Sequence, residues 1–131
     1  MRVDIAAYDD GKAISGPATW ASRMPVLLRE RGYDVRVLLP GWECGHSGLL
    51  ARKLQSEGIR YACLEFNSTE RNTRWFLEQV RSDRPQAFIA NHVLPALLLG
   101  GVLRRCGIPT VGVVRSDDPF YHALLEKFVA G

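Results

Sequence analysis

The stretch from residue 85 to residue 114 reads PQAFIANHVLPALLLGGVLRRCGIPTVGVV, and its pattern decides the fold. A short apolar run, Ala87–Asn91, precedes a longer apolar segment, Leu94–Arg105, and a second short run follows at Thr110–Val114. A glycine and a proline lie between the last two, as is common where a helix ends. The stretch therefore predicts a strand, a helix and a second strand, the unit that joins parallel strands by a right-handed crossover.

The same alternation fills the rest of the chain. Further short apolar runs, typical of strands buried on both faces, lie at Arg2–Tyr8, Val35–Leu39 and Tyr61–Phe66. Amphipathic stretches lie between these runs, and a last helix-like stretch covers residues 120–129. We therefore expect an α/β fold: one Rossmann-like, three-layer α/β/α domain over residues 1–131, with a parallel sheet of at least five strands in the order 3-2-1-4-5.

Composition excludes several classes of protein. Hydrophobic residues make up 47% and charged residues 24%, which is ordinary for a folded domain and argues against disorder. The three cysteines have no metal-site spacing, so free thiols in a reducing compartment are the simplest reading. We expect no secretory signal, because the N-terminal segment turns acidic too soon, and the longest apolar run, Val93–Leu103, is too short to cross a bilayer as a helix. We expect a cytoplasmic protein.

The net charge of +3 comes with two basic clusters. One is Arg52 and Lys53, and the other lies within residues 71–84. Such clusters are typical of solvated helix faces, and the sharper alternative is a surface that meets anionic lipid or phosphate.

Ligands of doubly wound sheets bind at the carboxyl ends of the strands, where the strand order reverses. The loops expected there are Asp9–Gly16, Asn91–Pro95 and Arg115–Pro119. The first has neither a dinucleotide fingerprint nor a P-loop, but Ser15 and Gly16 form a turn of small residues before a helix. Free N–H groups at that helix start could hold a phosphate or sugar oxygen; the alternative is an ordinary capped helix.

The other two loops carry candidate polar groups. His92 directly follows the fourth strand, where a neutral imidazole could take or give a proton, although a lone histidine is often structural. Arg115 follows the fifth strand and could pair with phosphate or carboxylate, or with an aspartate of its own loop. The pair Asp9 and Asp10 resembles the acids of receiver domains, but Asn67 and Arg115 stand where those domains need an acid and a lysine.

Three stretches, taken in order and spacing, resemble the N-terminal domain of the retaining GT-B glycosyltransferases of family 4. In the first, Gly16 opens a helix and the segment Arg31–Val35 leads into the second strand. The second is Arg84–His92, a proline followed by an apolar strand that ends near a histidine. The third is Cys106–Val114, which contains the Gly-Ile-Pro sequence before an apolar strand.

The resemblance implies a two-domain enzyme of which this chain is the acceptor-side half. It implies a nucleotide-sugar co-substrate held mostly by a C-terminal domain, an acceptor that is a glycan, a lipid or a small molecule, and no metal or other cofactor. It assigns catalytic positions to His92 and Asn91, and substrate binding to Ser15, Gly16, Arg115 and Ser116. The chain departs from the family where Asn91 replaces the second histidine of a His-x-His motif, where Ser15 replaces a glycine, and where Arg115 replaces a histidine.

Because half a cleft cannot align two substrates, we expect residues 1–131 to be inactive alone. Two alternatives stay open: a non-catalytic doubly wound binding or regulatory module, and a different Rossmann-type enzyme. The expected partners are the missing donor-binding domain and the acceptor, with no nucleic acid. Peripheral contact with the inner membrane face also stays open, since members of the family often act on lipid acceptors.

Overall fold

The computed structural model describes residues 1–9, 16–41, 48–65, 68–114 and 118–130. Strands and helices alternate along these ranges, as the sequence predicts. The strands are β1 (Arg2–Ala6), β2 (Asp34–Gly41), β3 (Arg60–Glu65), β4 (Ala87–Asn91) and β5 (Thr110–Val113). The helices are α1 (Gly16–Glu30), α2 (Leu49–Ser56), α3 (Thr69–Ser82), α4 (Leu94–Arg105) and α5 (Pro119–Ala130).

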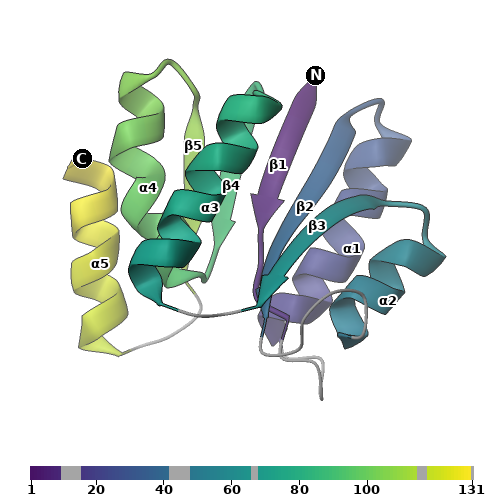
Figure 1. Cartoon of the computed structure of the whole chain (residues 1–131), viewed down its shortest axis with the longest axis horizontal. Coiled ribbons are helices and arrows are strands. Elements are labelled where there is room, and N and C mark those ends of the chain that lie inside the picture. The colour runs from purple at the N-terminus through teal and green to yellow at the C-terminus, as the bar shows by residue number, and fades with distance from the viewer. Residues whose placement is uncertain (10–15, 42–47, 66–67, 115–117, 131) are drawn as a thin grey trace.

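All the strand pairs are parallel, and the order is β3-β2-β1-β4-β5. This confirms the predicted fold class and strand order. Helices α1 and α2 lie behind the sheet in Figure 1, and α3, α4 and α5 lie in front of it. From β1 the sheet grows first toward one edge, through β2 and β3, and then toward the other edge, through β4 and β5. The strand order therefore reverses between β1 and β4.

Two hydrophobic clusters hold the three layers together. Ile5, Val37 and Leu54 belong to the cluster between the sheet and the α1–α2 layer. Phe76 and Phe88 belong to the cluster on the other face, where their rings meet edge to face with centroids 6.4 Å apart. Each of these five side chains is fully buried. The layers therefore rest on packing of apolar side chains against both faces of the sheet.

One expectation about the strands is wrong. The apolar run at residues 110–114 predicts a strand buried on both faces, but β5 pairs with β4 alone among the described strands, and Val111 is 56% exposed. The reason is the position of the helices on the α1–α2 side of the sheet. There α1 packs on β2 and α2 packs on β3, so within the described chain no helix covers this face of β5. The other strand limits differ from the predicted ones by at most two residues.

A buried ion pair joins the centre of the sheet to α3. Asp4 of β1 and Arg36 of β2 are register partners, and the Arg36 guanidinium donates to both carboxylate oxygens of Asp4, at 3.1 and 2.6 Å. Burial raises the pKa of Asp4, against the opposing effect of Arg36. Asp83, after α3, accepts from Arg2, and this hydrogen bond lowers the pKa of Asp83. The network extends from the middle of β1 and β2 to Asp83, the residue that follows α3.

Candidate functional site

The candidate site is the edge of the sheet at the carboxyl ends of β1 and β4, which we call the rim. Neighbouring parallel strands that leave the sheet in opposite directions open a crevice there, and ligands of doubly wound folds bind in it. In this chain β1 and β4 are such a pair, with Ala6 opposite Ala90 at the end of their shared register. Asn91 and His92 follow immediately, so the structure brings both predicted catalytic positions to the rim.

His92 has an unusual backbone. Its φ is +54°, in the left-handed region that residues with side chains seldom adopt, and among the described residues it alone does so without being glycine. Its N–H donates to the carbonyl of Val113 at 2.7 Å, which ties the end of β4 to the end of β5. Such conformations cost about 1–3 kcal/mol and gather at functional sites. The strain identifies His92 as the most distinctive residue of the rim.

The His92 ring is held by α5. It stacks on Tyr121, with ring centroids 4.4 Å apart and planes at 25°. His92 is half-buried, so the residue keeps part of its surface in contact with solvent. Tyr121 was not identified as a site residue from the sequence, because no local pattern predicts that its ring stacks on His92, a residue far away along the chain.

Asn91 is the last residue of β4 and only 1% exposed. It lies opposite Val113 in the register with β5. A buried amide of this kind needs hydrogen-bond partners, so its place at the end of a strand, next to His92, is suited to orienting a neighbouring group. The structure thus puts the two predicted catalytic residues side by side, with different exposure.

The predicted substrate-binding residues are described only in part. Gly16 is the first residue of α1, at the carboxyl side of β1, as expected. Ser15, Arg115 and Ser116 lie outside the described residues. The rim as described therefore consists of Asn91, His92, Tyr121 and the start of α1.

Asp9, in the first predicted functional loop, has a structural role instead. Its buried carboxylate accepts from the N–H groups of Leu50 at 3.3 Å and Ala51 at 3.0 Å, and so caps α2. A Cβ atom at Gly48 would overlap this carboxylate, so the cap requires a glycine there. A small residue before the apolar Leu49–Leu54 segment is the sequence signal that indicates a helix start there. It does not indicate which distant acid caps the helix. The Asp9 carboxylate is thus used as a helix cap, and Asp10, the other acid of the receiver-like pair, lies outside the described residues.

We predict that Asp9→Ala lowers the free energy of unfolding by about 2 kcal/mol, because two buried N–H groups lose their acceptor. Urea denaturation followed by circular dichroism measures the change. Asp118→Ala is the matched control: Asp118 caps α5 through the N–H of Phe120, but this cap is exposed, so the loss should be smaller. Equal losses for the two variants would contradict the role assigned to Asp9.

No group of three or more potential metal ligands (His, Cys, Asp or Glu) gathers in the part of the chain that the structure describes. Nor does any described helix combine the length and the apolar character needed to cross a membrane. Of the cysteines, Cys63 is half-buried at β3, Cys106 is an exposed free thiol, and Cys44 lies outside the described ranges.

Comparison with known proteins yields solved structures but no family. No protein-family model and no curated protein matches the chain. MurG from Acinetobacter baumannii is similar over 98% of this chain, with a TM-score of 0.70 and 14% identity, and the match covers 39% of the MurG chain. The C-terminal domain of a Pyrococcus furiosus hydrogenase is similar over 86% of this chain and 90% of its own, with a TM-score of 0.66 and 14% identity.

A third structure, the U34-tRNA thiolase NcsA from Methanococcus maripaludis, matches 99% of this chain and 56% of its own, with a TM-score of 0.51 and 10% identity. Identities this low establish a shared fold and leave function to the site. The chain spans about two fifths of the MurG chain that it matches. At this level the chain has a Rossmann-like α/β fold that is similar to a domain of MurG, a protein of the GT-B glycosyltransferase fold.

Proposed function

We propose that residues 1–131 form the acceptor-side lobe of a two-lobe glycosyltransferase that transfers a sugar from a nucleotide-sugar to a glycan, lipid or small-molecule acceptor. One observation carries the proposal: the strained, ring-stacked His92 lies beside Asn91 at the point where the strand order reverses. The likeness to MurG over nearly the whole chain supports it, as do the motifs around Gly16, Arg31–Val35 and Cys106–Val114.

In the proposed reaction an acceptor hydroxyl oxygen forms a bond to the anomeric carbon of the donor sugar. The bond from that carbon to the diphosphate oxygen breaks, and the diphosphate leaves with the electron pair. His92 accepts the proton of the hydroxyl, a role that suits an imidazole near neutral pH. Asn91 orients the groups beside it, and the N–H groups at the start of α1, near Gly16, face the negative charge of the donor or acceptor.

The proposal predicts no turnover by residues 1–131 alone and about a hundredfold lower kcat for His92→Asn in the polypeptide that carries both lobes. Asparagine tolerates the left-handed conformation of residue 92, so the variant removes the imidazole without straining the backbone. Release of nucleoside diphosphate from UDP- and GDP-sugars measures the rate. Arg74→Ala, on the exposed surface of α3, is the control and should leave kcat unchanged.

Two results would reject the two-lobe proposal. Sugar transfer by purified residues 1–131 would show that no second lobe is needed. A gene that ends near codon 131, or that continues into a domain without a second βα architecture, would favour the alternative of a non-catalytic binding or regulatory module. The hydrogenase domain, which this chain matches over most of its length, shows that the same fold exists in a domain of similar extent.

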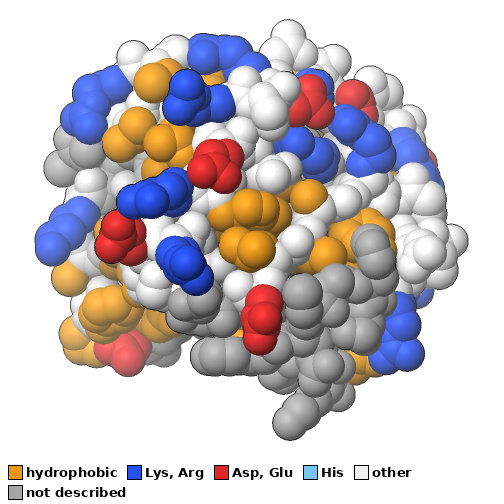
Figure 2. Space-filling model, viewed as in Figure 1, with side chains coloured by type: hydrophobic (Ala, Val, Ile, Leu, Met, Phe, Trp, Pro, Cys, Tyr) orange, Lys and Arg blue, Asp and Glu red, His pale blue; other side chains and the backbone are white. Residues whose placement is uncertain are grey.

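We further propose that the acceptor side includes contact with an anionic membrane surface. Figure 2 shows basic side chains over the upper parts of α3 and α4 with apolar side chains between them. Between α4 and α5, Leu98 is 46% exposed beside a small hollow that Arg105 and Lys127 also line. An apolar contact flanked by cations suits a lipid surface of negative charge.

Co-sedimentation with vesicles tests this contact. We expect binding to vesicles rich in anionic phospholipid at low salt, with a marked loss at high salt because the attraction is screened. The double variant Arg105→Glu/Lys127→Glu should bind far less, and Arg74→Glu on α3 should bind nearly as the unaltered chain does. Failure to bind anionic vesicles at any salt concentration would remove the membrane from the proposal.

A further inference from the structure

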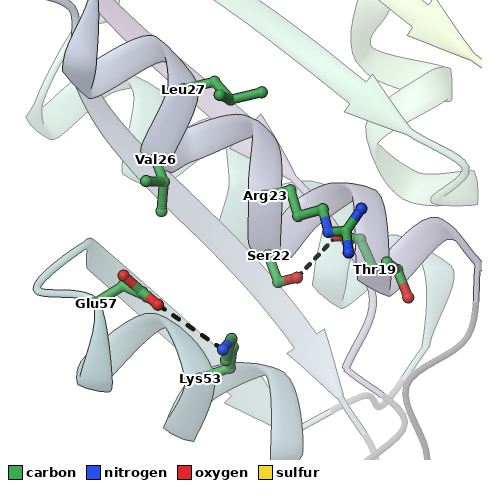
Figure 3. A pocket seen from close by; sticks show the side chains of 7 residues that line it. All are labelled: Thr19, Ser22, Arg23, Val26, Leu27, Lys53 and Glu57. Atoms are coloured by element: carbon green, nitrogen blue, oxygen red, sulfur yellow. Dashed lines mark hydrogen bonds and ion pairs between the residues drawn. The ribbon is translucent and has the colours of Figure 1, made fainter.

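A hollow of about 580 Å³ lies between α1 and α2, on the face opposite α3, α4 and α5 (Figure 3). Its α1 wall consists of Thr19, Ser22, Arg23, Val26 and Leu27, and the other wall consists of Lys53 of α2 and Glu57, which follows the end of α2. The rim residues Asn91 and His92 do not line this hollow. It is therefore a feature of the surface separate from the proposed transferase site.

The α1 wall runs from the buried side of that helix to its exposed side: Val26 packs on the core cluster and Ser22 is buried. Trp20, Met24 and Leu28 pack on the buried cluster, whereas Leu27 is 51% exposed. Ser22, one turn earlier, is small and turns its hydroxyl back to the carbonyl of Thr19 at 2.8 Å. The result is an open groove with a low floor at Ser22 and an exposed apolar side chain, Leu27, at its edge.

The charged residues that line the groove are two basic and one acidic: Arg23, Lys53 and Glu57. The two segments that build it, residues 16–32 and 48–58, carry more basic than acidic side chains: Arg23, Arg29, Arg31, Arg52 and Lys53 against Glu30 and Glu57. Glu57 already pairs with Lys53 at 3.8 Å, as Figure 3 shows. Arg23 makes no ion pair within the described part of the chain. The groove therefore offers positive charge to an incoming partner.

We propose that this groove docks an amphipathic α-helix of a partner protein, one that carries acidic side chains beside its apolar stripe. A groove between two helices can accept a third helix laid along it, and Arg23 and Lys53 on its two walls favour acidic side chains on that helix. A second copy of this chain does not fit, because none of its described helices has more acidic than basic residues.

The test uses residues 1–131 and a fluorescent peptide of about four helical turns, built from leucine at i, i+4 and i+7 positions and glutamate elsewhere. We expect saturable binding by fluorescence anisotropy. Arg23→Glu/Lys53→Glu should weaken it about tenfold or more by replacing attraction with repulsion. Leu27→Ser should weaken it about tenfold by removing apolar contact. Arg74→Glu, on α3, is the matched control and should change the affinity less than about twofold.

Circular dichroism confirms that each variant is folded, and hydrogen exchange should show protection of α1 and α2 on binding. A scrambled glutamate peptide and a peptide with lysine in place of glutamate are the ligand controls. The proposal is overturned if the acidic helix does not bind, if either control peptide binds equally well, or if Arg23→Glu/Lys53→Glu binds as tightly as the unaltered chain.

Discussion

Replacing Arg36 with methionine is expected to lower the free energy of unfolding by about 3–5 kcal/mol, because it strands a carboxylate in the protein interior. Asp4 is fully buried, and Arg36 gives it two hydrogen bonds. The same guanidinium also donates to the carbonyls of Gln79 and Asp83, both at 3.2 Å. The substitution therefore also removes the hydrogen bonds that hold the end of α3. Chemical denaturation at neutral pH measures the loss.

The matched control removes both charges. In Asp4→Leu/Arg36→Met the buried carboxylate is gone, and apolar side chains of similar size fill the space, so most of the lost stability should return. Arg74→Met serves as the surface control, since it breaks a largely exposed pair with Glu70 and should change stability little. A double variant no more stable than Arg36→Met would show that packing by the arginine, and not pairing of the charge, is what matters.

The pH dependence of Arg36→Met gives a second check. Burial raises the pKa of Asp4 in the folded state and Arg36 opposes this, so removing Arg36 raises that pKa further. An acid whose folded pKa lies above its unfolded value destabilises the fold once ionised, and the penalty disappears as the pH falls below both values. The deficit of the variant should therefore be largest near neutral pH and shrink in acid. A deficit independent of pH would contradict a stranded charge.

The fold was readable from the sequence because its signals are local. The limits of β4 are predicted without error, since an apolar run of strand length ends at the polar pair Asn91-His92. Gly107 follows the end of α4 with a φ of +82°, as its place after the apolar Leu94–Arg105 segment predicts. The environment of Val111 was not readable, because a run of valines looks the same whether or not another element covers it.

The site was readable only in outline, because its decisive contacts join distant residues. The chain order of strands and polar loops leads to Asn91 and His92, and the structure places both at the rim. Three further facts depend on folded geometry: the positive φ of His92, its stacking on Tyr121, and the capping of α2 by Asp9 from the end of β1. The spacing of residues along the sequence predicts none of these three facts.

Replacing Phe128 with alanine is the second substitution expected to have a large effect, a loss of about 3–5 kcal/mol. The Phe128 ring is 6% exposed and fills a notch between α4 and β5, where a Cβ at Gly100 would overlap it and one at Gly112 would lie 3.1 Å away. The guanidinium of Arg104 lies over the ring, 4.8 Å from its centroid, and also donates to the Phe128 carbonyl. Phe120→Ala, on the same helix but 55% exposed, is the control and should change stability by about 0.5 kcal/mol at most.

The same substitution also tests whether α5 positions the rim. Tyr121 reaches the His92 ring from this helix, so undocking the helix in Phe128→Ala should shift the imidazole resonances of His92, and Phe120→Ala should shift them less.

Gly100→Ala tests whether the lost stability comes from the fit between the Phe128 ring and the notch. Alone it should destabilise the chain, because the new methyl meets the ring; in the Phe128→Ala background it enters vacated space and should be tolerated or even stabilising. If the stability changes of the two substitutions were additive, Gly100 would not be what makes room for the Phe128 ring. The docking of α5 would then depend on its other contacts with α4.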